Sequence, residues 1–179
     1  MGISPFSTVD DLTQALRSLE DRHSDDLVPA LPHLLQTAET LAVDYPDDPT
    51  LIAAGLVHDI ASALDPACGD HARVGALLVT PLLGERVGDL VAGHTDAKRY
   101  LVTVDASYAG TLSPNSTHTL VLQGGPMTDD ELSAFERRAL WSAMVRLRRA
   151  DDAAKVPGRP VRAVGAWRPL LEGVASGVH

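Results

Sequence analysis

Cysteine, aromatic residues and long apolar runs are scarce in this 179-residue sequence. Cys68 is the single cysteine, so no disulfide can form within the chain and no cluster of thiolates can bind zinc. Aromatic residues make up only 4% of the chain, and the core must therefore consist mainly of Leu, Val and Ala. No window of about 18 residues is apolar throughout, so we expect no membrane partner.

Positive charge is also scarce, since the formal net charge is -9 and Lys98 and Lys155 are the only lysines. An acidic protein repels phosphate backbones, so nucleic acid is not an expected partner. Five arginines are expected to form a solvated helix face: Arg137, Arg138, Arg146, Arg148 and Arg149. The first residues show no basic stretch followed by an apolar run, which favours a cytoplasmic protein.

The spacing of apolar residues predicts a single all-α domain over residues 1–179. Its core covers about residues 23–158, with a helix before it and a tail after it. Ala and Leu favour helices, and few β-branched runs oppose them. The expected helices cover about residues 8–22, 32–45, 51–61, 70–83, 85–104, 116–122, 128–150 and 167–174.

The pair His58-Asp59 stands in an otherwise apolar stretch. Neighbours on a helix point about 100° apart, so one of the two must leave the apolar face or find a polar partner. An unpaired carboxylate is very costly to bury, whereas a metal ion accepts both imidazole and carboxylate as ligands. The pair therefore indicates a metal site.

Further candidate ligands lie on other expected helices: His33, His71, His94 and, where the long helix ends, Asp151 and Asp152. A lone histidine on an apolar helix is more often a hydrogen-bonded core residue than a ligand. Candidates on five separate helices favour the metal, because side chains from facing helices converge in the middle of a bundle.

Four short segments carry a resemblance to a known family. Residues 93–102 have the sequence Gly-His-Thr-Asp-Ala-Lys-Arg-Tyr-Leu-Val, 106–108 Ala-Ser-Tyr, 123–127 Gln-Gly-Gly-Pro-Met and 155–158 Lys-Val-Pro-Gly. Together with the His-Asp pair, they resemble the mixed-valence diiron oxygenases of the HD superfamily, and among these the branch that cleaves phosphonates and is related to myo-inositol oxygenase. The similarity extends over about residues 23–158.

The resemblance implies a complete set of iron ligands. One iron would take His33, His58 and Asp151, the second would take His71 and His94, and Asp59 would bridge the two. Asp152 remains an alternative to Asp151, because both stand at the end of the same expected helix.

The same resemblance assigns the substrate side of the site. Lys98 follows His94 by one helical turn and should point into the same cavity. Lys98, Arg99 and Ser116 would hold a phosphonate group, Gln123 would belong to the pocket wall, and Lys98 and Asp59 would take part in catalysis.

Three positions depart from the family pattern. His23 and Asp26 stand where the family has a tyrosine and a glutamate, and Ser62 replaces a histidine. His23 could still bind the second iron, and Asp26 could still face a cationic substrate tail. The departures affect the substrate side and leave the six ligands in place.

The expected function is an iron-dependent oxygenase that uses O2 to cleave the C–P bond of a small 1-hydroxyalkylphosphonate into a carboxylic acid and phosphate. The cofactor would be two irons in the Fe(II)/Fe(III) state. The alternative is a metal-dependent HD phosphohydrolase, in which a metal-activated water attacks a phosphate ester. The sequence leaves the phosphonate and the oligomeric state open.

Overall fold

The computed structural model describes residues 4–20 and 28–177, and in these ranges every regular element is a helix. The expected all-α class is confirmed. None of the helices in the described ranges combines the length and apolar character that a bilayer span requires. The elements are α1 (Val9–Arg17), α2 (Ala30–Asp44), α3 (Pro49–Val57), α4 (Ile60–Leu64), α5 (His71–Leu83), α6 (Glu85–Val104), η1 (Tyr108–Thr111), α7 (Pro114–Leu122), α8 (Asp129–Glu136), α9 (Trp141–Ala153), η2 (Val164–Trp167) and α10 (Arg168–Ala175).

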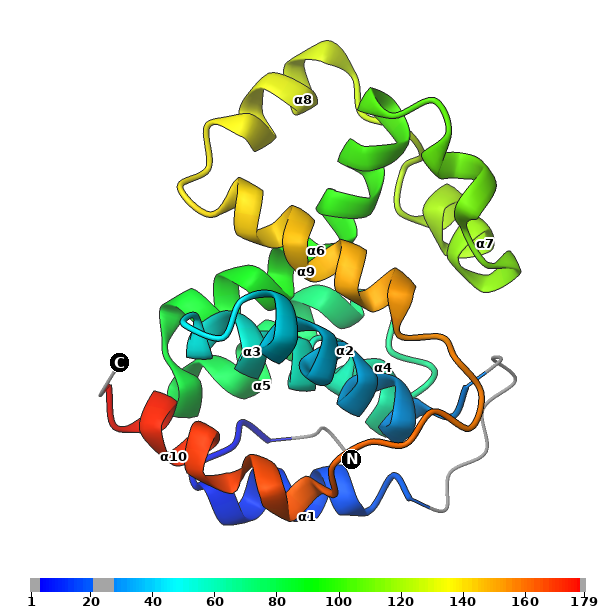
Figure 1. Ribbon diagram of the computed structural model, residues 1–179. Helices are drawn as coiled ribbons and strands as arrows, with labels where there is room; N and C mark the ends of the chain where they lie inside the picture. The colour runs from blue at the N-terminus through cyan, green and yellow to red at the C-terminus, as the bar shows by residue number, and fades with distance from the viewer. Residues whose placement is uncertain (1–3, 21–27, 178–179) are drawn as a thin grey trace.

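The helices form a lower body and a smaller upper part (Figure 1). Helices α2, α3 and α5 make up the body, and α1 and α10 lie side by side along its lower edge. Helix α6 packs against α5 in the body and runs upward to the region of α7 and α8. Helix α9 crosses between the two parts and packs on both α2 and α6, which places its C-terminal end beside the body.

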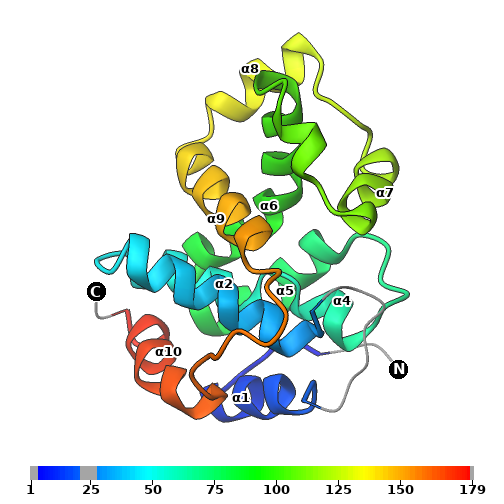
Figure 2. The same ribbon diagram turned by 45° about the vertical axis from the view of Figure 1, so that its right-hand side comes forward.

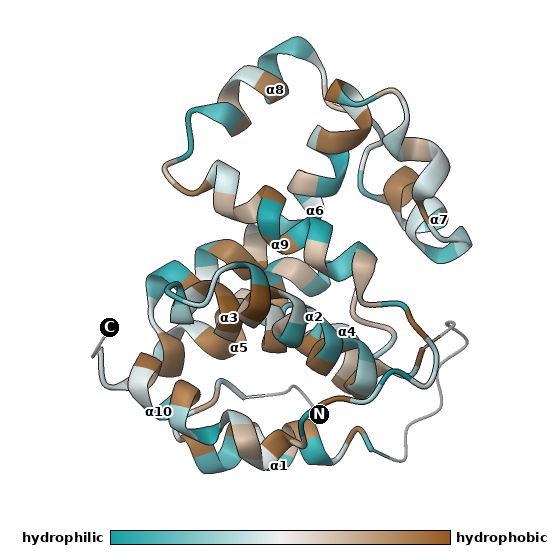
Figure 3. Ribbon diagram, in the orientation of Figure 1, coloured by the Kyte–Doolittle hydropathy of each residue, from teal (hydrophilic) through white to brown (hydrophobic). Residues whose placement is uncertain are grey.

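Helix α3 is the centre of the body because it is apolar on all sides. Every residue from Thr50 to Val57 is buried, and the helix is among the brownest segments in Figure 3. Pro49 occupies the first turn, and the Asp48 side chain accepts a hydrogen bond from Leu51 N at 3.0 Å. Such a helix can present polar groups only at its ends.

The expected helix over residues 51–61 is interrupted at His58-Asp59, which is a correction to the sequence prediction. Helix α3 ends at Val57, Asp59 has φ -106° and ψ 17°, and α4 begins at Ile60. The break turns the Asp59 carboxylate out of the apolar interior of α3, so its side chain keeps 31% exposure while His58 is fully buried.

The expected long helix over residues 128–150 is also divided, into α8 and α9. Its start is as expected, since Thr128 and Glu131 form a capping box. Phe135 then packs against Tyr100 of α6, with ring centroids 5.0 Å apart, and the chain turns before α9 begins. Tertiary packing of the aromatic residues thus overrides the helical propensity of the connecting residues.

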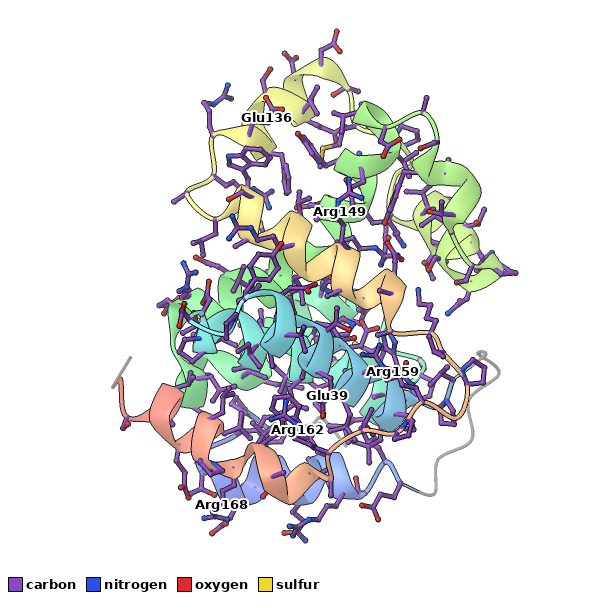
Figure 4. All side chains as sticks on the ribbon, viewed as in Figure 1. Glu39, Glu136, Arg149, Arg159, Arg162 and Arg168 are labelled. Atoms are coloured by element: carbon purple, nitrogen blue, oxygen red, sulfur yellow. The ribbon has the colours of Figure 1, made fainter. Side chains whose placement is uncertain are left out.

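The segment after α9 is fastened to the surface of α2. The Gln36 side-chain amide donates to Val156 O at 2.9 Å and accepts from Val156 N at 3.1 Å. Farther along, Arg162 donates three hydrogen bonds to Glu39 of α2, from its backbone N at 2.9 Å and from its side chain at 2.8 and 3.0 Å; both residues are labelled in Figure 4. These contacts fix the chain around Lys155, which faces the site described next.

Candidate metal centre

Four histidines and two aspartates converge where α2, α3, α5, α6 and α9 meet. The break after α3 contributes two of them, and four helices contribute one each. The six are His33 of α2, His58 and Asp59 of the break, His71 of α5, His94 of α6 and Asp151 of α9.

Asp59 lies between two pairs of histidines. Its Oδ2 atom is 3.4 Å from His58 Nε2 and 3.9 Å from His33 Nε2. Its Oδ1 atom is 3.3 Å from His94 Nε2 and 3.4 Å from His71 Nε2. Each carboxylate oxygen therefore faces one histidine pair, which is the arrangement of a bridging ligand.

Asp151 belongs to the first pair. Its Oδ1 atom is 3.2 Å from His33 Nε2 and 3.9 Å from His58 Nε2. Asp152, the alternative left open by the sequence, instead pairs with Arg148. The geometry supports Asp151 as the ligand, because its Oδ1 atom faces two histidines, whereas both oxygens of Asp152 bond to Arg148.

The backbone sets the orientation of the imidazole rings. His33 Nδ1 lies 3.0 Å from Ala154 O, and His58 Nδ1 lies 2.9 Å from Gly55 O. His94 is held in the same way. A carbonyl oxygen accepts but cannot donate, so each Nδ1 carries the proton and each Nε2 presents its lone pair to the cluster.

These lone pairs lie close together. His33 Nε2 is 3.3 Å from His58 Nε2, and His71 Nε2 is 3.3 Å from His94 Nε2. Two lone pairs at that separation repel unless a metal ion or a proton lies between them. A metal ion about 2.1 Å from each nitrogen, with bonds roughly at right angles, separates the nitrogens by about 3 Å. The residues thus fit two metal ions, one at each histidine pair, with Asp59 shared.

Without a metal, a proton supplies part of the missing positive charge. Burial lowers the pKa of His58, but Asp59 and Asp151 outweigh burial and raise this pKa to about 9. For Asp59, burial raises the pKa, whereas His58 and His94 hold it well below its usual range. The metal-free cluster is therefore a binding site for positive charge.

Binding of ferrous iron to the metal-free protein at pH 7 is expected to release about one proton from His58. The sign follows from the raised pKa: below about 9 the imidazole holds a proton that the metal must displace, so iron affinity rises with pH up to that value. Titration calorimetry in buffers of different ionisation enthalpy measures the proton count. A heat that is independent of the buffer would contradict the expectation.

An open cavity of about 880 Å³ lies against the cluster. Its lining comes from α2, α4, the segment between α4 and α5, α6, α7 and the end of α9. Figure 2 shows α4 and α7 on the same side of the molecule. Candidate metal donors and α7 therefore line the same cavity.

Three cationic side chains of the cavity wall converge on Ser116 of α7. Lys98 Nζ donates to Ser116 O at 3.3 Å and to Thr119 Oγ1 at 2.8 Å. Lys155 Nζ lies 3.2 Å and Arg148 Nη2 lies 3.5 Å from Ser116 Oγ. We call Lys98, Arg148, Lys155 and Ser116 the cationic wall; it suits a compact anion with several oxygens.

The burial of Arg148 corrects the sequence analysis, which placed this arginine on a solvated face. Arg148 is 4% exposed, and its Nη1 atom donates to Asp151 Oδ2 at 2.5 Å. Its position three residues before Asp151 was the available signal, because such residues lie on one side of a helix. Lys155 was also missed, because its segment was used only as part of the family resemblance and the lysine was given no role.

The remaining expected substrate residues have different positions. Ser62 and Gln123 line the cavity, and the buried Gln123 Oε1 has no hydrogen-bond partner in the described structure. The Arg99 side chain instead donates to Gly125 O at 2.9 Å and to Glu131 Oε1 at 2.8 Å, which fixes the turn after α7. His23 and Asp26 lie outside the described residues.

Comparison with known proteins agrees with this architecture. The HD domain family model matches residues 33–131, more than half of the chain. The hydroxymethylphosphonate dioxygenase of Gimesia maris is 34% identical over 168 residues, which cover 88% of this chain and 83% of the relative. The [1-hydroxy-2-(trimethylamino)ethyl]phosphonate dioxygenase (glycine-betaine-forming) of Leisingera caerulea is 33% identical over 132 residues, covering 69% of this chain and 67% of the relative.

A shorter match joins the chain to a third kind of oxygenase. The probable inositol oxygenase of Oryza sativa subsp. japonica is 40% identical over 53 residues, which cover 29% of this chain and 17% of the relative. The resemblance expected from the sequence is thus confirmed. The chain belongs to the HD-domain family, in the group that contains these phosphonate dioxygenases.

Proposed function

We propose that this protein is an iron-dependent oxygenase that cleaves the C–P bond of a small 1-hydroxyalkylphosphonate. The reaction converts the substrate and one O2 into a carboxylic acid and phosphate. The C1–H and C–P bonds break, new C–O and P–O bonds form, and O2 accepts four electrons. Substrate and O2 contain all the atoms of the two products, so no water is consumed.

One observation carries the proposal: a donor set for two metals adjoins a wall of three cations. The metal donors are the four histidines, Asp59 and Asp151. The cationic wall fits the phosphonate, whose charge approaches -2 at neutral pH. A substrate bound there has its C1 carbon between the anion subsite and the metal donors.

When bound, the two irons would supply the redox chemistry that activates O2. His33, His58 and Asp151 would hold one iron, and His71 and His94 the other, with Asp59 between them. The protein side chains orient the substrate: Lys98 and Lys155 attract the phosphonate from two sides of Ser116. The mixed-valence state and the cytoplasmic location remain predictions.

The described cavity lining favours an uncharged substituent at C1. Recognition of a quaternary ammonium group commonly uses a cage of aromatic rings. All seven Phe, Tyr and Trp residues of the chain lie in the described ranges, and none of them lines the cavity. The wall near α4, which includes Ala63, Pro66 and Ala67, also offers no carboxylate beyond the metal donors to a cationic group among the described residues.

We therefore expect iron-reconstituted protein to release phosphate from hydroxymethylphosphonate with a kcat/KM at least about tenfold above that for the trimethylammonium-ethyl analogue. The assay measures phosphate from a panel of 1-hydroxyphosphonates in air, with p-nitrophenyl phosphate as a hydrolase substrate. A preference for the quaternary ammonium compound would contradict the tail assignment. Turnover of the phosphate ester alone would favour the HD phosphohydrolase.

Phosphonate affinity should decrease as the pH rises through about 8. The pKa of Lys98 is lowered to about 8, mainly by burial and next by the positive charge of Arg148. Below this value the amine is charged and attracts the anion; above it the amine is neutral and the attraction is lost. The measurement is the dissociation constant of hydroxymethylphosphonate as a function of pH. In the control variant Lys98→Arg, the loss of affinity at alkaline pH should shift to a higher pH. An unchanged pH dependence in Lys98→Arg would contradict the assignment.

A further inference from the structure

The Arg148 guanidinium connects the metal ligands with the cationic wall. Its Nη1 atom donates to Asp151 Oδ2 at 2.5 Å, and its Nη2 atom lies 3.5 Å from Ser116 Oγ. The other oxygen of Asp151 faces His33 Nε2. The direction in which this planar group points therefore affects a metal ligand and the anion subsite at once.

Two residues outside the cavity lining hold the far side of the guanidinium. Arg148 Nε donates to Tyr108 OH at 3.0 Å and to Asp152 Oδ2 at 3.2 Å, and Nη2 donates to Asp152 Oδ1. The Tyr108 hydroxyl in turn donates to Asp152 Oδ2, which closes a ring of hydrogen bonds. Tyr108 is 5% exposed and belongs to η1, so it reaches Arg148 from another part of the chain.

The charges in this ring favour a fixed geometry. Burial, and then the carboxylate of Asp152, raise the pKa of Tyr108, so its hydroxyl stays protonated and can donate. Asp152 uses both oxygens on Arg148, which is the bidentate pairing that restricts a guanidinium most strongly. The Nε atom bonds to Tyr108 and Asp152. The Nη1 atom, on the opposite side of the guanidinium, bonds to Asp151.

We propose that Tyr108 and Asp152 are positioning residues that fix Arg148 against Asp151 and Ser116. Neither residue lines the cavity: Tyr108 acts through Arg148, whereas Asp152 acts through Arg148 and also pairs with Lys155 at 3.5 Å. The role toward Asp151 rests on the donor geometry, whereas the role toward Ser116 rests on the proposed function. The role of the Ala-Ser-Tyr segment at 106–108 is then to place Tyr108 against Arg148, which in turn holds Asp151.

Tyr108→Phe and Asp152→Asn test the proposal, with Tyr100→Phe as the matched control. Tyr100 is also buried, and its hydroxyl donates to Glu136 at 3.2 Å, away from the cavity lining. The first readout is ferrous iron affinity by competition with a chelator, where loss of an outer support lowers metal affinity about tenfold or more. The second is kcat and KM for hydroxymethylphosphonate, with a higher KM expected in both test variants and not in Tyr100→Phe.

A double-mutant cycle separates action through Arg148 from general destabilisation. Lysine has no guanidinium, so in an Arg148→Lys background Tyr108 can no longer act on Asp151 through this group. Tyr108→Phe should then lower iron affinity by less than about twofold. An equally large loss in both backgrounds would overturn the proposal. So would a lower melting temperature with wild-type iron affinity and wild-type KM. If wild-type protein cleaves no phosphonate, the proposed function fails, and the iron affinities still decide the role of Tyr108.

Discussion

Asp59→Asn is expected to reduce phosphate release by about a thousandfold or more and to lower the bound iron from two to at most one per chain. Asp59 is the only one of the six donors that faces both histidine pairs, with Oδ2 toward His58 and Oδ1 toward His94. An asparagine offers one neutral oxygen in place of two charged ones. Its amide group would also point a donor at one of the metal positions.

The measurement combines colorimetric iron determination with a phosphate assay on reconstituted protein. Asp89→Asn is the matched control, because Asp89 is exposed on α6 and the substitution is the same. The control should keep two irons and full activity. An Asp59→Asn protein that retained both would show that the carboxylate is not a shared ligand.

Lys98→Met is expected to lower kcat/KM for hydroxymethylphosphonate by about a hundredfold or more, because removing one partner from a buried charge pair costs about 2–5 kcal/mol. Lys98 is 2% exposed and donates to Ser116 O and Thr119 Oγ1, so its charge acts in a site with little water. Methionine has nearly the same length, which limits the effect on packing. The iron content should stay at two, because Lys98 is not among the metal donors.

The control for Lys98→Met removes a cation far from the cavity. Arg168 is labelled on α10 at the lower edge of Figure 4, where it pairs with Glu172 at 2.7 Å. Arg168→Met should leave kcat/KM unchanged. A Lys98→Met protein with wild-type kcat/KM would mean that the anion binds elsewhere.

The six candidate metal donors came from a local conflict at His58-Asp59 and from the family resemblance, and the structure brings all six together. His58 and Asp59 conflict with an apolar helix, and helical spacing alone places His94 and Lys98 on one side of α6. Because one metal ion needs several ligands, such groups on neighbouring helices are expected to meet at a single site. The two aspartate candidates at the end of α9 are distinguished by their partners.

The parts that the sequence did not predict depend on contacts between distant segments. Arg148 stands in a run of arginines, and only the approach of Tyr108 and Ser116 shows that this one is buried. The break at Asp59 carries no proline or glycine, and it is favoured by the convergence of four histidines on the carboxylate. The turn between α8 and α9 likewise depends on packing of Phe135 against α6.

The most direct test of the account is the stoichiometry of O2 consumed to phosphate released during turnover of hydroxymethylphosphonate by iron-reconstituted protein. An oxygen electrode and a phosphate assay on the same sample measure it, with a nitrogen-purged sample beside them. We predict one O2 per phosphate, and no phosphate under nitrogen. Phosphate released without O2 consumption would contradict the oxygenase and assign the two-metal site to hydrolysis.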